Sequence, residues 1–321
     1  MYSLLKTARP TLRHGLQRLV RSMAARRSSR QCLNLVYSAL SRREKARFHA
    51  LCNALFTDGG AQLEDGSWIV KFAGKRLVLP LTAEGGWQEW DAAVAILGHD
   101  LEIKTTYANL LRWRRPQLFF DVGANYGLHS LLFLVHGIRT VSFEPNANCH
   151  AYLRRVCELN NLVCNIQPVA LSDVEGFTEL WFPGKQTWMG TTDAHVRESL
   201  GKDFGLCSLE VEQTTIDNFV ARHGCRPDLI KIDTEGSELR VLKGSRETLG
   251  SIRPLVIFES WPEGRDGLFR MFEEVDYRIS QLPLLPRFPA RVLENCSFLE
   301  HPARNFIALG ADQVASGGGL L

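Results

Sequence analysis

A strand, a glycine-bearing turn and a downstream acid form the most informative pattern in this chain of 321 residues. Residues 118–122 read Leu-Phe-Phe-Asp-Val and continue into Gly123-Ala-Asn-Tyr-Gly127, and a second apolar stretch ends at Phe143-Glu144. Such a turn lets a ligand approach the backbone, and the free N–H groups of the next helix bind a carboxylate or phosphate. Glu144 lies where a carboxylate accepts hydrogen bonds from ribose hydroxyls. The pattern therefore predicts a site for an adenosine-containing ligand.

The turn departs from the pattern that binds dinucleotides. It lacks the Gly-x-Gly-x-x-Gly spacing that is typical of pyrophosphate binding. A ligand without pyrophosphate, whose amino-acid tail carries a carboxylate and an ammonium, suits Asp121, Asn125 and the helix start better, and S-adenosylmethionine is such a ligand. Two alternatives stay open: the glycines can serve tight packing alone, and the enzyme can be an NAD(P)-dependent oxidoreductase.

An acidic block follows a later predicted strand. Asp233 ends the strand predicted over 228–232, Glu235 and Glu238 follow, and Glu259 ends the next predicted strand. The carboxyl ends of parallel strands meet at one edge of the sheet, so these acids should line a negative crevice. Carboxylates there can orient a hydroxyl, take its proton or hold a divalent ion. Glu235 and Glu238 could instead only stabilise the start of the following helix.

Three further features are candidates for the site. Asp173 follows a predicted strand and could accept a hydrogen bond from the exocyclic amine of adenine, although Asp is also common in turns. His129 lies in the first turn of the predicted helix and could act as a base or simply pack. The loop of residues 182–208, which includes His195, could be a lid over an acceptor or an irregular packed loop.

Strands and helices must alternate to position these residues. We predict an α/β fold, a Rossmann-like, mostly parallel seven-stranded sheet with a final antiparallel strand and helices on both faces. The predicted strands are 118–122, 139–143, 165–171, 228–232, 254–259, 277–281 and 305–309, and the predicted helices are 128–136, 147–160, 237–249 and 265–274.

Four regions are predicted along the chain. Residues 1–60 form a basic helical arm, and residues 61–115 form a cover made of a hairpin near 68–79 and a helical segment over 87–115. Residues 116–312 form the main domain, and residues 313–321 form a disordered tail.

The charge of the chain is divided unequally. The net charge is +3, yet residues 1–50 hold twelve Lys or Arg and one acid, so they carry +11 and leave −8 for the rest. The basic segment is consistent with a helix on an anionic membrane, a transit peptide or a solvated arm. A body of −8 disfavours nucleic acid as a partner.

The apolar stretches and the cysteines indicate in which compartment of the cell we expect the protein. No apolar run reaches the ~18 to 20 residues of a membrane span, and eight scattered cysteines show no metal-binding spacing. We therefore expect a cytoplasmic protein, with peripheral membrane contact through residues 1–50 as an open alternative.

Taken together, the motifs resemble the FkbM family of S-adenosylmethionine-dependent methyltransferases. The matching segments are Asp121–Gly127, Phe143–Pro145, Ala170–Asp173, Thr215–Asp217, Lys231–Glu238, Leu242–Gly244 and Phe258–Glu259. The resemblance implies that Asp121, Gly123 and Asn125 contact the methionine end of the cofactor, Glu144 the ribose and Asp173 the adenine region. It also implies O-methylation of a sugar, a glycan or another small hydroxyl acceptor, and Gly127 belongs to the same cofactor turn.

Methyl transfer to a hydroxyl needs positioning and a base. The sulfonium donor is already activated, so the protein mainly aligns the two partners and draws away the hydroxyl proton. Our candidates for the base, in order, are Asp233, Glu259 and His129. A divalent metal is possible without direct support. A non-catalytic cofactor-binding module recruited through the basic arm is the alternative from another class.

Overall fold

The computed structural model describes residues 10–52, 62–184, 189–286 and 289–315. The contacts divide the chain into two compact units, which are described separately. Unit 1 holds the residues up to 101 together with 155–161, and unit 2 holds 102–154 and the residues from 162 onward.

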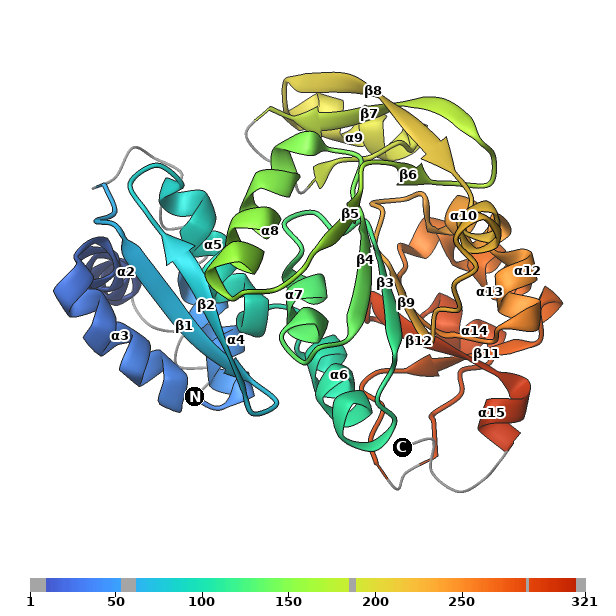
Figure 1. The fold of residues 1–321 in the computed structure, drawn as a ribbon, viewed down its shortest axis with the longest axis horizontal. Coiled ribbons are helices and arrows are strands. Elements are labelled where there is room, and N and C mark those ends of the chain that lie inside the picture. Colours follow the sequence, from blue (N-terminus) through green and yellow to red (C-terminus); the bar gives the residue numbers. More distant parts are fainter. Residues whose placement is uncertain (1–9, 53–61, 185–188, 287–288, 316–321) are drawn as a thin grey trace. The chain divides into compact units, whose positions relative to one another are not determined.

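Seven strands form the central sheet of unit 2 (Figure 1). Their order across the sheet is β11-β12-β10-β9-β3-β4-β5, and β12 runs antiparallel to both of its neighbours. This confirms the predicted α/β fold with a mostly parallel sheet and a final antiparallel strand. The strands are β3 (Leu118–Val122), β4 (Arg139–Phe143), β5 (Asn165–Gln167), β9 (Leu229–Ile232), β10 (Leu255–Glu259), β11 (Tyr277–Gln281) and β12 (Asn305–Gly310).

Both faces of this sheet are covered, because every position of its central strands β3 and β9 is buried. All five residues of β3 are buried. Phe120 contacts Phe219 of α10, with ring centroids 5.7 Å apart, whereas its neighbour Phe119 contacts Phe133 of α7 at 4.3 Å. Successive side chains of a strand point to opposite faces, so helices on two sides are needed to bury them.

The helices of unit 2 supply these covering layers. Figure 1 shows α6 and α7 on one side of the sheet and α10, α12 and α13 on the other. The helices are α6 (Leu101–Trp113), α7 (Leu128–Leu134), α8 (Ala147–Leu159, which continues into unit 1), α10 (Ile216–His223), α11 (Glu238–Lys243), α12 (Arg246–Ser251), α13 (Arg265–Glu274), α14 (Asn295–Leu299) and α15 (Ala311–Ala315), with a 3-10 turn, η2 (Pro262–Gly264).

A second, three-stranded sheet in unit 2 has the order β6-β8-β7. It corrects the strand predicted over 165–171, which is two strands in different sheets. Pro168 lies between them and has no N–H for a ladder hydrogen bond, so the strand ends there. The elements are β6 (Ala170–Leu171), β7 (Gly176–Pro183), α9 (Ala194–Asp203) and β8 (Leu206–Thr214).

Two predicted helices are also interrupted. The helix predicted over 237–249 is α11 and α12, separated at Gly244, where a Cβ would lie 2.0 Å from the carbonyl oxygen of Ser172. The helical segment 87–115 is α5 and α6, separated at Asp100, whose φ is +45°. The first predicted helix is thus interrupted by tight packing at Gly244, and the second by the left-handed backbone at Asp100. Residues 316–321 of the predicted tail lie outside the described residues.

Unit 1 combines three N-terminal helices with the predicted hairpin. β1 and β2 pair antiparallel through a turn at Ala73 and Gly74, both with positive φ. The elements are α2 (Pro10–Ala25), α3 (Arg27–Ala39), α4 (Arg42–Cys52), β1 (Gly66–Phe72), β2 (Lys75–Leu81) and α5 (Gly86–Gly98).

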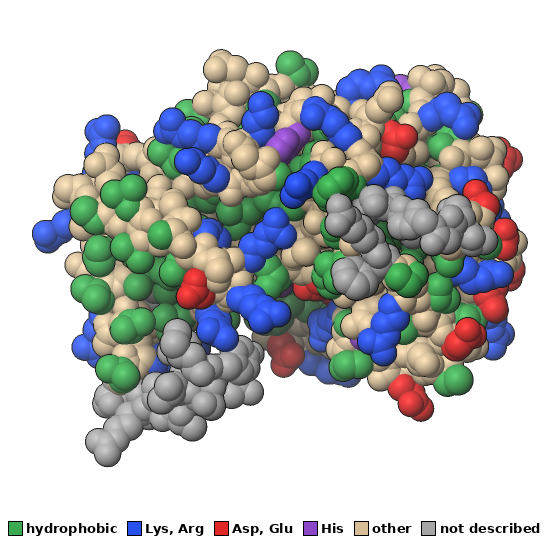
Figure 2. Space-filling model, turned by 90° about the horizontal axis from the view of Figure 1, so that it is seen from below, with side chains coloured by type: hydrophobic (Ala, Val, Ile, Leu, Met, Phe, Trp, Pro, Cys, Tyr) green, Lys and Arg blue, Asp and Glu red, His purple; other side chains and the backbone are tan. Residues whose placement is uncertain are grey.

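Aromatic rings and one buried guanidinium hold unit 1 together. Trp68 lies 5.2 Å from Tyr37 and 5.5 Å from Trp90, measured between ring centroids. Arg30 is 1% exposed and donates to backbone carbonyls that include those of Ala24 at 2.7 Å and Glu64 at 2.6 Å. The basic N-terminal segment therefore contains folded helices. Figure 2 shows hydrophobic side chains exposed over this unit, at the left of the view.

Candidate active site

Four of the predicted acids lie at the carboxyl ends of β3, β4, β9 and β10 in unit 2. Asp121 pairs in register with Lys231 across β3 and β9, and Ile232 pairs with Phe258 across β9 and β10. Asp233 and Glu259 therefore follow adjacent strands, as the sequence predicted. This edge is where open α/β sheets bind their ligands.

The turn after β3 has three residues in the left-handed region. The φ angles are +75° at Gly123, +51° at Asn125 and +71° at Gly127. A Cβ at Gly123 would lie 1.8 Å from the carbonyl oxygen of Asp233, and one at Gly127 would lie 2.5 Å from Leu153. Both glycines are thus required by packing within the chain. The case for a ligand depends on the polar groups around the turn.

Asp121 supplies one such group. It is fully buried, and its Oδ2 accepts hydrogen bonds from the backbone N–H of Ser130 at 2.9 Å and from the Ser130 hydroxyl at 2.6 Å. Its Oδ1 is buried and has no hydrogen-bond partner among the described residues. Burial raises the pKa of Asp121, and the nearby Lys231 ammonium opposes that shift. An unsatisfied buried acceptor is costly unless a donor reaches it.

Glu144 is oriented by the backbone of two neighbouring turns. Its Oε2 accepts from the N–H of Asn125 at 2.7 Å and its Oε1 from the N–H of Asn146 at 2.8 Å. Burial raises its pKa to about 7, although these two hydrogen bonds oppose the shift. Each oxygen keeps a second lone pair, so the fixed carboxyl group can still accept from a diol.

The two remaining predicted site residues, Asp173 and His129, contact neighbouring side chains. Asp173 is exposed just beyond β6 and accepts a hydrogen bond from the Ser172 hydroxyl at 3.2 Å. His129 is half-buried, and its Nδ1 lies 3.1 Å from the hydroxyl of Tyr107 on α6. The ring of His129 also makes an edge contact with Tyr107, which is consistent with a packing role.

A group of three carboxyls forms the centre of the acidic edge. One carboxylate oxygen from each of Asp233, Glu235 and Glu259 lies within 4.8 Å of the others. Burial, followed by the charge of Asp233, raises the pKa of Glu259 to about 9 and that of Glu235 to about 8. Both shifts favour the protonated forms of Glu235 and Glu259 near neutral pH. Carboxyls this close cannot all ionise, because like charges repel at short range.

Asp233 differs from the other two because it has a cationic partner. The Lys231 ammonium lies 2.7 Å from its Oδ2, and the Lys231 side chain is buried. This ion pair fixes the position of the Asp233 carboxylate, so it is the carboxyl of the group that is best oriented toward a proton donor.

The same three carboxyls could ligate a divalent ion. Acidic oxygens are the ligands that Mg²⁺ and Ca²⁺ prefer. The Lys231 ammonium, however, already supplies a positive charge at Asp233.

Glu238 has a structural role. Its Oε1 accepts hydrogen bonds from the N–H and the hydroxyl of Thr234, at 2.9 and 3.0 Å, and from the N–H of Gly236 at 3.2 Å. The carboxyl group thus stabilises the turn between β9 and α11, which was one of the two interpretations of the sequence.

Part of the predicted lid forms hydrogen bonds with the turn between β9 and α11 and with α11 itself. The hydroxyl of Thr191 donates to the carbonyl of Glu235 at 2.7 Å, and the hydroxyls of Thr192 and Ser237 lie 2.8 Å apart. Arg240 also donates to the Thr192 carbonyl at 2.9 Å. Residues 185–188, which include part of the predicted lid, lie outside the described residues. The role as a lid stays a prediction.

Lys231 was not among the site residues selected from the sequence. The signal for Lys231 was present, because a charged residue interrupts the otherwise apolar stretch Leu-Ile-Lys-Ile of β9. A buried ammonium in a four-residue strand requires a carboxylate partner.

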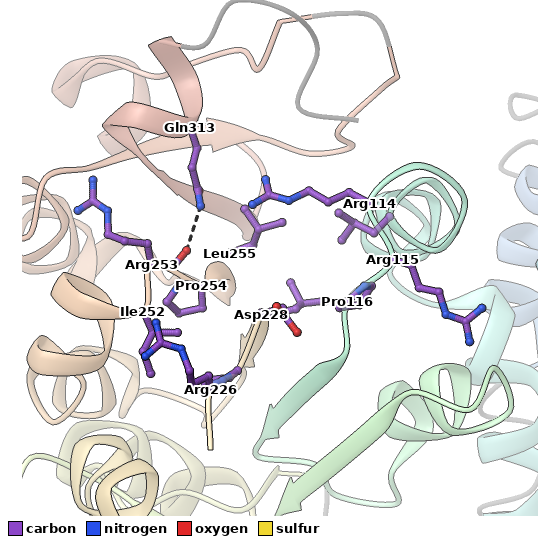
Figure 3. A pocket seen from close by; sticks show the side chains of 13 residues that line it. Arg114, Arg115, Pro116, Arg226, Asp228, Ile252, Arg253, Pro254, Leu255 and Gln313 are labelled. Carbon is purple, nitrogen blue, oxygen red and sulfur yellow. Dashed lines mark hydrogen bonds between the residues drawn. The ribbon is translucent and has the colours of Figure 1, made fainter. Parts of the chain in front are cut away.

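A cavity of about 330 Å³ lies at the opposite edge of the main sheet (Figure 3). Its lining includes Pro116, Asp228 and Pro254, which precede β3, β9 and β10 respectively. It therefore opens at the amino ends of the strands, away from the acidic edge. Arg114 and Arg226 also line it.

Comparison with known proteins gives the family. The family model for the methyltransferase FkbM domain matches residues 121–282. Methyltransferase sdnD of Sordaria araneosa is 27% identical over 190 residues, which cover 50% of this chain and 73% of that protein.

Two solved methyltransferase structures are similar to part of this chain. An FkbM methyltransferase from Methylobacillus flagellatus has a TM-score of 0.37 at 17% identity, covering 68% of this chain and 54% of its own. The chain thus spans about half the length of that protein. An S-adenosylmethionine-dependent methyltransferase from Agrobacterium tumefaciens has a TM-score of 0.39 at 10% identity, covering 79% of this chain and 72% of its own.

The α/β fold of unit 2, with its final antiparallel strand, is the one predicted for a methyltransferase domain. Because the family model matches half of the chain, this protein belongs to the FkbM family of methyltransferases.

Proposed function

We propose that this protein transfers the methyl group of S-adenosylmethionine to a hydroxyl of a sugar, a glycan or another small acceptor. The observation that carries the proposal is the acidic edge of unit 2, where the Lys-paired Asp233 stands beside the protonated Glu235 and Glu259. A charged carboxylate next to two proton donors suits a neutral hydroxyl acceptor, which both gives a proton and accepts hydrogen bonds.

The turn after β3 offers groups that fit the cofactor. The buried Oδ1 of Asp121 has no partner in the described chain, and an ammonium would satisfy it. We propose that Asp121 and Asn125 hold the methionine end, with Gly123 and Gly127 shaping the turn. A carboxylate is also favourable beside the positive sulfonium, whose methyl group is the one transferred.

The remaining contacts concern the adenosine. In this proposal the fixed carboxyl of Glu144 accepts from the ribose hydroxyls, and Asp173 lies near the exocyclic amine of adenine. Asp173 is exposed, so we expect its contribution to be smaller than that of the buried Glu144.

Asp233 is the proposed base. It accepts the hydroxyl proton as the acceptor oxygen bonds to the methyl carbon and the bond from that carbon to sulfur breaks. Lys231 holds the carboxylate in place at 2.7 Å. Glu259, the second candidate, is protonated at neutral pH and would donate to the acceptor, and His129, the third, is engaged by Tyr107.

Methyl transfer from labelled S-adenosylmethionine to a panel of nucleotide sugars and glycans tests the proposal. We expect Asp233→Asn to lower kcat by about 10²- to 10⁴-fold, the usual contribution of a positioned base, with little change in cofactor affinity by calorimetry. Asp266→Asn is the matched control, because Asp266 lies exposed on α13 in an ion pair with Arg270.

Three outcomes would count against the proposal. Full activity of Asp233→Asn would remove the assigned base. Binding of NAD(H) but not S-adenosylmethionine would favour an oxidoreductase. Cofactor binding without turnover on any acceptor would favour a non-catalytic module. Assays with and without a chelator and divalent ions decide whether the carboxyl group needs a metal.

A further inference from the structure

Helix α2 of unit 1 exposes a row of leucines. Leu12, Leu16 and Leu19 are 64%, 44% and 57% exposed. Their spacing of four and three residues puts them on one face of the helix. Val20 and Ala24 are buried within unit 1, so α2 has both a buried face and an exposed apolar face.

Helix α3 has a similar outer face. Leu35 and Val36 are 72% and 61% exposed, and the exposed Cys32 lies one turn earlier. Leu33 and Tyr37 of the same helix are buried in unit 1. Apolar side chains in water are ordinary when single, but two adjoining helices with such faces indicate an interaction surface. Figure 2 shows hydrophobic side chains exposed over unit 1.

Exposed arginines lie on or beside the same two helices as these leucines. Arg13 and Arg18 are exposed on α2, and Arg26 and Arg27 are exposed where α2 meets α3. None of these four arginines forms an ion pair within the described chain. Glu44 is the single acid in residues 1–50, and its carboxylate caps α4 through Ser41.

We infer that α2 and α3 bind the surface of an anionic membrane. Leucines that enter the acyl boundary and arginines that contact phosphate headgroups are the two parts of an interfacial helix. A nucleic acid would use the arginines and leave the leucines in water, and a second copy of the chain would bring the arginines together. None of the helices within the described residues is long and apolar enough to cross a bilayer.

Vesicle sedimentation with the full chain tests the inference. We expect binding to vesicles of phosphatidylcholine containing about one-third phosphatidylglycerol and little binding to phosphatidylcholine alone, with affinity falling steeply between about 50 and 500 mM salt. Arg13→Gln with Arg18→Gln should weaken binding about thirtyfold, from ~1 kcal/mol for each cation near the surface. Arg139→Gln with Arg154→Gln, which removes two exposed arginines elsewhere, should change it less than about threefold.

The leucines are tested separately from the charges. Leu16→Ser with Leu19→Ser should weaken binding at least about tenfold through lost apolar burial. Leu159→Ser with Val163→Ser is the matched control, since those side chains are 49% and 88% exposed and lie outside α2 and α3. Circular dichroism and thermal unfolding check that every variant folds.

Four results would overturn the inference. These are equal binding to neutral vesicles, unchanged binding of the leucine variant, binding to an oligonucleotide in place of vesicles, or a dimer that the leucine substitutions dissociate while vesicles go unbound. The inference does not depend on the proposed function, because the vesicle assay requires neither cofactor nor turnover.

Discussion

Replacing Glu259 by Gln should stabilise the protein increasingly as the pH rises. Burial and the charge of Asp233 raise the pKa of Glu259 to about 9, whereas in the unfolded chain its pKa is about 4.5. Between these values the folded protein holds a proton that the unfolded chain has released. Unfolding therefore releases a proton, and the free energy of unfolding falls as the pH rises through this window.

Glutamine is neutral at every pH and has nearly the shape of the protonated carboxyl. The free energy of unfolding of the variant therefore does not fall through titration at this position. One proton released on unfolding changes the free energy of unfolding by ~1.4 kcal/mol per pH unit. Between about pH 6 and pH 8 the stability gap between variant and wild type should widen by at most ~2.7 kcal/mol. Glu259 is partly exposed, and solvent screening reduces the effect, so we expect a widening of about 1 to 2 kcal/mol.

Urea denaturation at both pH values, followed by circular dichroism, measures the gap. Glu235 lies beside Glu259 and titrates together with it, so the gap between variant and wild type measures the titration of this pair of carboxyls. Glu273→Gln is the control, because Glu273 is exposed on α13, and its gap should stay within about 0.5 kcal/mol. A gap for Glu259→Gln that is the same at both pH values would refute the assignment of a protonated Glu259.

Two further predictions concern the packing and charges of the same edge. Lys231→Met should lower the free energy of unfolding by about 2 to 4 kcal/mol, because it leaves Asp121 and Asp233 without their buried cation, and adding Asp121→Asn should recover part of the loss in urea denaturation. Wild-type stability of Lys231→Met would contradict the role of this ammonium. Gly123→Ala should cost at least about 3 kcal/mol, whereas Gly137→Ala, with a similar φ of +72° but nothing within 4 Å of the new Cβ, should cost only ~1 kcal/mol. Equal melting temperatures for the two alanine variants would show that the backbone contact at Gly123 is unimportant.

Much of the fold could be predicted because its signals are local. The five buried positions of β3, the hairpin turn at Ala73 and Gly74, and the strands over 277–281 and 305–310 follow from apolar patterns and turn residues that lie close in sequence. Alternation of strands and helices then limits the arrangement to a covered, mostly parallel sheet. The acids that follow these strands must share one edge, so their grouping was also predictable.

Errors arose where distant segments meet. The carbonyl oxygen of Ser172 lies where a Cβ at Gly244 would be, and residues 170–171 leave the main sheet to pair with β8. Neither contact partner is near in the sequence.

The sequence by itself therefore determined the class of fold, the edge that carries the candidate site and the residue types present there. Only the tertiary structure decided which carboxyls carry protons, because burial and neighbouring charges set the pKa values of Glu235 and Glu259. It also decided that Lys231 pairs with Asp233 and that Gly123 serves packing against Asp233. Charge state and steric fit depend on distances between segments that are far apart in the chain, and local sequence patterns do not specify those distances.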